Sequence, residues 1–213
     1  MKIIVFGARG DVGSRVVAEA LSRNHTVTAV VRDARQVSSL PEGASAVVID
    51  VRHTNDLARA MAGHDLAVSA IRPPQGHEPD LVPLTESVLD AAAATRVRVL
   101  VVGGAARLFV PGTDRHTVLT APGFLPVAVV PVARASQAQY ELCLSHEGAD
   151  WVYASPAAML TPGNRTGSYR SGKDELLVNE DGDSTVSMED FAVALVDEGE
   201  ANRLHRDRFT VAY

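Results

Sequence analysis

The chain has 213 residues, 46% of them hydrophobic, and a formal net charge of −6 at pH 7. This length suffices for one α/β domain with a full core, and the lack of any basic block argues against a nucleic-acid partner. No apolar run is long enough to cross a bilayer, and the strand pattern that begins directly after Met1 leaves no room for a signal peptide. Cys143, the one cysteine, has no disulfide or metal partner in the sequence, so we expect a core residue in a cytoplasmic protein.

The first predicted elements are a strand, a glycine-rich turn and a helix. Apolar residues 3–6 are followed by Gly7, Gly10 and Gly13, and residues 14–23 have helical periodicity. This order predicts the phosphate-binding turn of a nucleotide-binding α/β domain, and a glycine-rich turn without a ligand is the alternative. Gly7 permits the turn, Gly10 lets main-chain N–H groups approach a pyrophosphate, and Gly13 lets the helix pack closely. We expect the Asp11 carboxylate to face solvent, and we assign the pyrophosphate site to Gly7, Arg9, Gly10, Asp11, Val12 and Gly13.

The second strand, predicted at residues 26–31, ends at Arg32 and Asp33, and this junction bears on the choice of cofactor. In NAD-binding folds an acidic side chain at this place binds the ribose hydroxyls. Here Arg32 comes first, and its guanidinium suits the 2′-phosphate of NADP, which Arg9 would approach from the other side. Arg35 is a third candidate, but for Arg35 alone we accept the alternative of a solvated surface arginine. The pattern favours NADP, and Asp33 keeps NAD as an alternative.

Strand and helix patterns then alternate along the chain. Strands are predicted at residues 46–49, 66–70 and 98–102, and helices at residues 54–62 and 79–95. Five such alternations indicate a doubly wound parallel sheet, whose ligands bind at the carboxyl ends of the strands. The residues at these ends are therefore expected to contact adenine, ribose and nicotinamide: Asp50, Val51, Ser69, Ala70, Ile71, Gly103 and Gly104.

The periodicity fails over residues 107–133, which are rich in proline. Because an irregular segment of this length inside a compact domain is usually functional, we expect it to cover the nicotinamide end, and core packing of its apolar residues is a compatible reading. The remaining pattern predicts a helix at residues 134–146, a strand at 151–154, a strand at 176–178, a helix at 188–198 and a strand at 208–213. Ser187 is the expected N-cap of the last helix, and Pro156 and Ala157 are expected beside the nicotinamide.

Several motifs resemble one family over almost the whole chain. They are FGARGDVG at residues 6–13, GHDLAVSAI at 63–71, VVGGAARL at 101–108, ADWVYASPAAMLTPGNRTGSYR at 149–170, STVSMEDFAVALVDE at 184–198 and RFTVAY at 208–213. The chain resembles the atypical short-chain dehydrogenases/reductases, in their NAD(P)H-binding group of NADH-flavin-reductase-like proteins. That group is related to biliverdin reductase B and to NmrA-like proteins.

The resemblance implies a single Rossmann-like, NAD(P)-binding domain over residues 1–213. Its small C-terminal substrate lobe would come from about residues 107–133 and 157–187. The resemblance also implies NAD(P)H binding and, in some relatives, hydride transfer to a flavin. Carried over residue by residue, the family pattern implies a pyrophosphate contact at Gly7, Gly10 and Gly13, a 2′-phosphate contact at Arg32, an adenine wall at Asp50 and Val51, and ribose and nicotinamide contacts at 69–71, 103–104 and 156–157.

The departures from the family pattern concern catalysis. Short-chain dehydrogenases pair a tyrosine with a lysine one helical turn later, which lowers the tyrosine pKa for proton exchange with a carbonyl. We expect this chain to lack the pair (YxxxK), since Tyr140 in the predicted helix is followed four residues later by Leu144. The family also tends to carry a serine where this chain has Arg107. Flavin reduction does not need these groups, because hydride passes directly from nicotinamide to the flavin ring.

The leading prediction is therefore an NADPH-dependent oxidoreductase of the flavin-reductase type, with FMN or FAD as a candidate substrate. The alternatives are a non-catalytic NmrA-like redox sensor and an isomerase, dehydratase or reductase specific for one metabolite. Weak catalytic candidates are Arg107, His116 and Tyr169, whereas Tyr153 is more simply a core residue. The seven histidines show no metal-ligand spacing, so no metal is predicted. We expect a small-molecule substrate and no membrane or nucleic-acid partner, and the pattern leaves the oligomeric state open.

Overall fold

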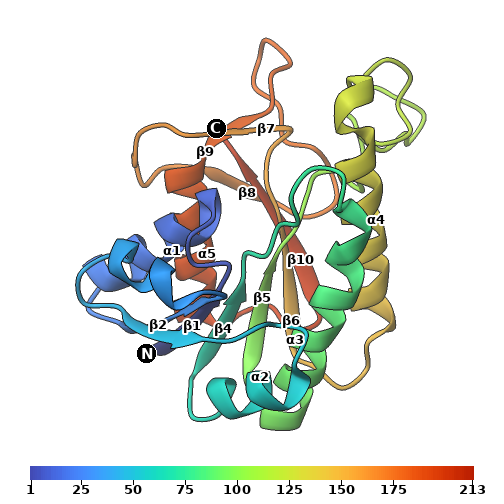
Figure 1. The fold of residues 1–213 in the computed structure, drawn as a ribbon. Coiled ribbons are helices and arrows are strands. Elements are labelled where there is room, and N and C mark those ends of the chain that lie inside the picture. The colour runs from blue at the N-terminus through green and yellow to red at the C-terminus, as the bar shows by residue number, and fades with distance from the viewer.

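The computed structural model describes all residues, 1–213, and is organised around one mostly parallel sheet (Figure 1). The strands of this sheet are β1 (Lys2–Phe6), β2 (Thr26–Val31), β3 (Ser45–Val48), β4 (Leu66–Ser69), β5 (Arg98–Val102), β6 (Trp151–Ser155), β8 (Arg170–Gly172) and β10 (Asp207–Ala212). Their order is β3-β2-β1-β4-β5-β6-β10-β8, and only β8 runs antiparallel to its neighbour. The doubly wound parallel sheet predicted from the sequence is confirmed.

The strand order reverses between β1 and β4. From β1 the chain moves outward through β2 to β3, and then returns to add β4, β5 and β6 on the other side of β1. The two connections that leave the carboxyl ends of β1 and β4 therefore diverge, and open α/β sheets bind ligands at such a point. The first glycine turn lies there.

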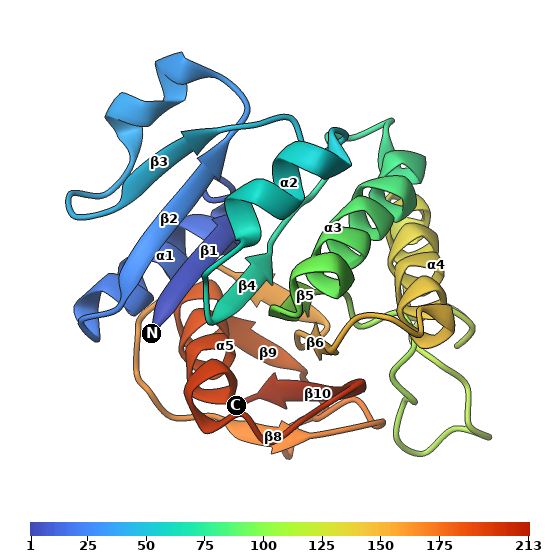
Figure 2. The ribbon, with the colours of Figure 1, turned by 90° about the horizontal axis from the view of Figure 1, so that it is seen from below.

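Helices cover both faces of the sheet (Figure 2). They are α1 (Asp11–Ser22), α2 (Thr54–Met61), α3 (Leu81–Thr95), α4 (Val130–Ser145) and α5 (Met188–Ala201), with 3₁₀ segments at Ala34–Ser39, Glu78–Asp80 and Val127–Val129. One buried cluster joins α1 and α5 to the sheet, and a second joins α2, α3 and α4 to the opposite face. None of the α-helices is both long and apolar enough to cross a membrane.

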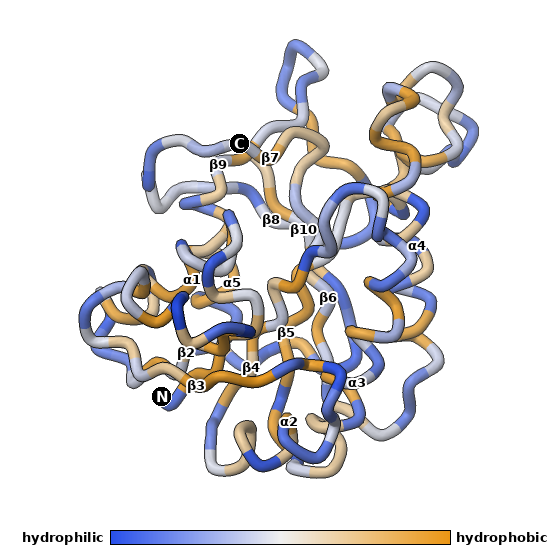
Figure 3. Tube along the Cα trace, in the orientation of Figure 1, coloured by the Kyte–Doolittle hydropathy of each residue, from blue (hydrophilic) through white to orange (hydrophobic).

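The core explains why the strands appear in the sequence as unbroken apolar runs. Along β1, Ile3 and Val5 belong to the cluster under α1 and α5, whereas Ile4 and Phe6 belong to the cluster under α2 and α3. Both faces of a covered parallel strand are buried, so both sets of alternating side chains must be apolar. Figure 3 shows the resulting apolar colour along the central strands.

The beginning of α4 differs from the expectation that residues 107–133 are irregular throughout. The helix starts at Val130, four residues earlier than predicted, and Pro131 lies in its first turn. Proline is tolerated there because the N–H group it lacks would have no partner inside the helix. The irregular segment is correspondingly shorter.

The strand predicted at residues 176–178 is wrong. The strand in this region is β8, which pairs with β10, and Leu176 only donates a main-chain hydrogen bond of 2.8 Å to the carbonyl of Phe109. Leu176 is buried with Leu108 and Val118 in a small separate cluster, which accounts for its apolar pattern. Two short strands, β7 (Met159–Thr161) and β9 (Thr185–Ser187), pair with each other and have no counterpart in the prediction.

The first turn of α5 confirms the expected N-cap. The Ser187 hydroxyl accepts a hydrogen bond of 2.9 Å from the main-chain N–H of Asp190, which satisfies one of the unpaired donors of the helix start. The helix continues to Ala201, beyond the predicted end at residue 198, and ends at Asn202 in the left-handed region with φ 48°. Asparagine tolerates this conformation better than most residues.

Candidate functional site

The turn between β1 and α1 is packed so tightly that side chains are excluded from it. Gly7 has φ +72°, and a Cβ on it would lie 2.4 Å from the carbonyl oxygen of Ala70. A Cβ on Gly13 would lie 2.1 Å from the carbonyl oxygen of Gly7. These two glycines therefore let the end of β4 and the first turn of α1 contact the same turn.

The start of α1 is not capped by any side chain of the protein. Gly10 is its N-cap and donates a main-chain hydrogen bond of 2.9 Å back to Gly7, and the Asp11 side chain is exposed, as predicted. The first N–H groups of a helix have no partner within it, and together with the helix dipole they attract an anion. The geometry of this turn therefore suits a pyrophosphate.

The ends of β4, β5 and β6 continue the same edge of the sheet. Ser69 and Ala70 are buried at the end of β4, and the Ser69 hydroxyl has no hydrogen-bond partner in the protein. Gly103 and Gly104 follow β5, and the buried pair Pro156 and Ala157 follows β6. Since β1, β4, β5 and β6 are consecutive in the sheet, the structure brings these sequence-predicted residues to one edge.

Two exposed arginines lie at the carboxyl ends of β1 and β2. Arg9 belongs to the glycine turn, and Arg32 directly follows β2, which pairs with β1. Neither guanidinium makes a hydrogen bond or an ion pair within the protein. Both side chains are therefore available to a ligand at this end of the edge.

Asp33, which follows Arg32, is engaged by the protein itself. Its carboxylate caps the 3₁₀ segment by accepting a 2.9 Å bond from the main-chain N–H of Arg35, and it also binds the Arg35 guanidinium. The hydrogen bonds from Arg35 lower the pKa of Asp33. Sequence reasoning took Arg35 for a solvated residue, and only the Asp-x-Arg spacing signals this pair.

The same arrangement recurs after β3. Asp50 accepts hydrogen bonds of 3.0 Å from the main-chain N–H and from Nε of Arg52, and these contacts lower its pKa to about 2. Val51 between them is buried in the core cluster that joins α2, α3 and α4 to the sheet. Both carboxylates at this end of the edge are thus held by an arginine two residues later.

The weak catalytic candidates are not brought together. Arg107 Nη1 lies 3.9 Å from Glu141 Oε1 on α4, and His116 is exposed in the irregular segment. Tyr169 donates a hydrogen bond to Asp197 in the last turns of α5, next to Glu198, which binds Arg98 at the amino end of β5. The Tyr169 hydroxyl is therefore held on α5, although the next residue, Arg170, pairs with Ala212 at the carboxyl end of β10.

The expectation that the chain lacks the Tyr-x-x-x-Lys spacing is wrong, because Tyr169 and Lys173 have it. In the structure, however, strand β8 lies between them, so the two side chains are not on one helical turn. Lys173 Nζ binds Asp207 Oδ2 at 2.8 Å, at the first residue of β10, while Tyr169 binds Asp197. The spacing does not form the catalytic pair of short-chain dehydrogenases.

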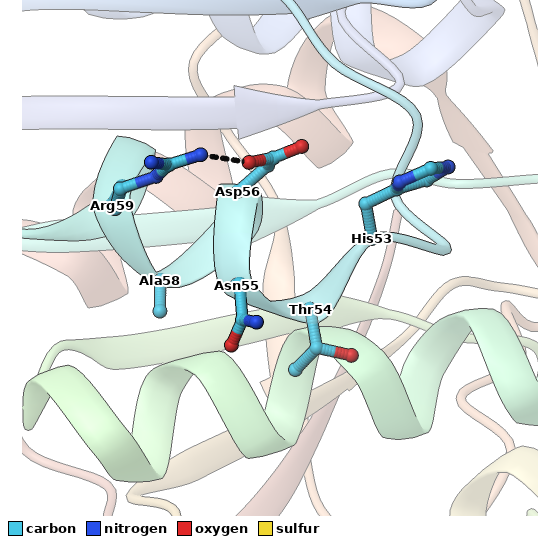
Figure 4. Close-up of a pocket in the computed structure, with 6 residues that line it drawn as sticks. All are labelled: His53, Thr54, Asn55, Asp56, Ala58 and Arg59. Carbon is cyan, nitrogen blue, oxygen red and sulfur yellow. Dashed lines mark hydrogen bonds and ion pairs between the residues drawn. The ribbon is translucent and has the colours of Figure 1, made fainter.

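A cavity of about 840 Å³ lies elsewhere. It follows the exposed surface of α2 (Figure 4), where Arg59 pairs with Asp56 and where Asn55 and Ala58 are on the side toward α3. All its lining residues come from this one short helix and the residue before it, so no polar groups converge on it from several elements. We therefore place the functional site at the carboxyl edge. No group of three or more histidine, cysteine, aspartate or glutamate side chains is positioned to hold a metal ion.

Comparisons with known proteins show the family and the fold of the chain. A model of a family described as NAD(P)H-binding matches residues 7–199. The protein YwnB of Bacillus subtilis (strain 168) is 35% identical over 213 residues, which are 99% of this chain and 98% of that protein. A candidate NADH-flavin reductase from Streptococcus pneumoniae TIGR4 is 30% identical, with a TM-score of 0.88 and coverage of 100% of this chain and 99% of that chain. A candidate epimerase from Bacteroides thetaiotaomicron is 35% identical, with a TM-score of 0.88 and coverage of 100% and 96%.

These findings confirm the family resemblance that the motifs carry. The matched range starts at Gly7 and ends in the last turns of α5, so it contains the glycine turn and most of the sheet. The two structures share the fold over the whole of this chain, although their names point to different reactions. The chain thus belongs to the NAD(P)H-binding family.

Proposed function

We propose that the protein is an NADPH-dependent oxidoreductase that transfers hydride from nicotinamide to a flavin or another small conjugated acceptor. The observation that carries the proposal is the charge pattern after β1 and β2. Arg9 and Arg32 have no partner in the protein, whereas Asp33 is held by Arg35. A free guanidinium pair at this place suits the 2′-phosphate of NADP, which NAD lacks.

The dinucleotide would lie across the carboxyl edge. Its pyrophosphate would bind the uncapped start of α1 at Gly10 and Gly13, and its adenine would pack on Val51. The nicotinamide would then lie on Gly103 and Gly104, where a side chain is excluded because a Cβ would meet Tyr153 or Ser136. The acceptor would sit between residues 107–133 and residues 157–172.

The proposed reaction requires the protein to position the nicotinamide and the acceptor, and it does not require a protein group to transfer a proton. NADPH would give a hydride to the acceptor and become NADP⁺, while the acceptor takes its proton from solvent. The buried Tyr153 has no path to solvent, and Tyr140 has Leu144 where short-chain dehydrogenases have lysine. The protein would accelerate the reaction by holding the two rings in contact. The name of the Streptococcus pneumoniae relative supports a flavin as the acceptor.

The first test is the cofactor preference. Arg32→Ala should weaken NADPH binding by about tenfold, the typical scale of one charge-assisted contact, and leave NADH binding unchanged. Calorimetric titration with both dinucleotides measures this difference. Lys2→Ala, which removes an exposed positive charge from the opposite end of β1, is the matched control and should change neither affinity. Equal loss of NADPH and NADH affinity in Arg32→Ala would contradict the assignment.

The second test is turnover. The wild-type protein is mixed with NADPH and with FMN, FAD or a quinone, and the absorbance of the reduced nicotinamide is followed. A second candidate function, a dinucleotide-binding redox sensor, is favoured by the burial of Tyr153 and by the separate pairing of Tyr169 with Asp197 and of Lys173 with Asp207. Tight binding of NADPH without turnover over a broad acceptor panel would select the sensor.

A further inference from the structure

Tyr153 of β6 occupies the space beneath the glycine pair at the end of β5. A Cβ on Gly103 would lie 2.1 Å from two ring atoms of Tyr153, so the ring and the missing side chain fit each other. The main-chain N–H of Gly104 donates a hydrogen bond of 3.2 Å to the Tyr153 hydroxyl. The ring therefore supports one glycine and the hydroxyl holds the next.

The same hydroxyl ties the glycine pair to two helices. Tyr153 Oη lies 2.9 Å from the carbonyl oxygen of Ser136 and 3.2 Å from Gln139 Oε1, both on α4. Gln139 Nε2 in turn donates a 3.0 Å bond to Thr85 Oγ1 on α3. All these side chains are buried, and Tyr153 is 1% exposed. A buried chain of hydrogen bonds thus runs from Gly104 into the layer of α4 and α3.

The hydroxyl keeps one protonation state in this environment. Burial raises the pKa of Tyr153, and the hydrogen bond from Gly104 only partly opposes this effect. A neutral hydroxyl has a single hydrogen to donate, here to Ser136 or Gln139, and accepts from Gly104 with its oxygen. Tyr153 is therefore a fixed spacer and does not exchange protons with a substrate.

We propose that Tyr153 is a positioning residue that sets the height and orientation of the Gly103–Gly104 main chain under the nicotinamide ring. This inference rests on the proposed function for the location of the nicotinamide. Because the Gly104 N–H is engaged by Tyr153, the glycine pair presents a flat surface without a side chain to the ring. A displacement of this surface would change the distance between nicotinamide and acceptor, on which the hydride-transfer rate depends steeply.

Tyr140 offers a matched control on the same side of the sheet. Its ring centroid lies 4.9 Å from that of Tyr153, and it is 9% exposed. Its hydroxyl makes no hydrogen bond within the protein. Tyr140→Phe therefore removes the same atom as Tyr153→Phe from the same buried cluster without touching Gly104.

The experiment compares Tyr153→Phe and Tyr140→Phe with the wild type. Phenylalanine keeps the ring under Gly103, so NADPH affinity should stay within about twofold while kcat falls about tenfold, a loss of transition-state positioning alone. The fluorescence emission and lifetime of the nicotinamide in bound NADPH should change as well. Tyr140→Phe should leave affinity, kcat and emission at wild-type values. Wild-type kcat and emission in Tyr153→Phe, or equal effects in both variants, would overturn the proposal.

A second pair of variants reaches the same turn from α4. A Cβ on Gly104 would lie 2.6 Å from Ser136 Oγ, so Gly104→Ala should displace the turn and lower kcat. Adding Ser136→Gly makes room for the new methyl group and should restore most of the lost rate. An unchanged kcat in Gly104→Ala, or no rescue by the second substitution, would count against Tyr153 as a positioning residue.

The two hypotheses fail in different ways. Wild-type protein that binds NADPH but reduces no acceptor would remove the proposed enzyme activity, and the emission of bound NADPH would still test Tyr153. Turnover by the wild type with identical emission and kcat in Tyr153→Phe would remove only the positioning role.

Discussion

Two carboxylates at the carboxyl edge of the sheet, Asp33 and Asp50, are each held by an arginine two residues later in the chain. Asp33 stands where NAD-binding folds carry the ribose-binding acid. Its pair with Arg35 therefore engages the group that would favour NAD, which is consistent with the NADPH preference proposed above. We infer that Arg35 acts on cofactor preference through Asp33.

Arg35→Ala should accordingly remove the guanidinium from Asp33, whose carboxylate then keeps only the main-chain bond from residue 35 and can also bind the ribose hydroxyls. We expect the ratio of NADH to NADPH affinity to rise by about fivefold, equivalent to about 1 kcal/mol. Arg35 is exposed, and exposed ion pairs contribute little to stability, so Tm should stay unchanged. Arg52→Ala releases Asp50 in the matching turn after β3 and should leave the ratio as it is. Titration of both variants with both dinucleotides measures the effect, and an equal ratio change in the two would argue against this role of Arg35.

At the scale of elements, the cap of α5 fixes how the C-terminal part of the chain meets the sheet. Besides capping the helix, the Ser187 hydroxyl donates a 2.9 Å bond to the carbonyl of Asn164 and lies 2.8 Å from the Tyr213 hydroxyl. One side chain thus joins the helix start, the irregular segment after β7 and the last residue of the chain. The helix itself is buried on almost every side.

Ser187→Ala should therefore destabilise the fold without changing the chemistry. The lost cap costs about 1 kcal/mol, and the other contacts add to that, so thermal unfolding should show a Tm several degrees lower. Ser22→Ala is the control, because the Ser22 hydroxyl only bonds a carbonyl of its own helix and the residue is exposed. Because α5 covers the face opposite α3 and α4, NADPH affinity should be unchanged well below Tm, and a selective loss of affinity would be inconsistent with this picture.

At the scale of the whole molecule, buried acids connect α1, α5 and the segment between β7 and β8. Glu19 on α1 binds Arg165, and the hydrogen bonds from Arg165 lower its pKa against the opposing effect of burial. Burial alone would raise the pKa of Asp190, but hydrogen bonds from Thr166, Tyr213 and Gly167 outweigh it and lower the pKa. An irregular segment is thus held by carboxylates of two helices.

These depressed pKa values predict how stability depends on pH. A carboxylate that binds protons less readily in the folded state stabilises the fold above its ordinary pKa of about 4, and this contribution is lost as pH falls through the lower, folded value. Tm should therefore be steady from pH 7 to about pH 5 and fall below that. Glu19→Gln should lower Tm at pH 7 and make the fall at acid pH shallower, whereas Glu42→Gln, at an exposed residue, should do neither. Parallel pH profiles for Glu19→Gln and the wild type would refute the contribution of Glu19.

The sequence by itself determined the sheet, the helices that cover it, the glycine turn and the family. These features are local, since apolar runs, helical periods and a turn such as Gly7 to Gly13 follow from neighbouring residues. Only the tertiary structure decided that β8 and not residues 176–178 pairs with β10, that the Tyr169 hydroxyl binds Asp197 on α5, and that Tyr153 supports Gly103. Each of these contacts joins residues far apart in the chain. Whether a residue is apolar or polar does not predict which distant residue it contacts once the sheet has formed.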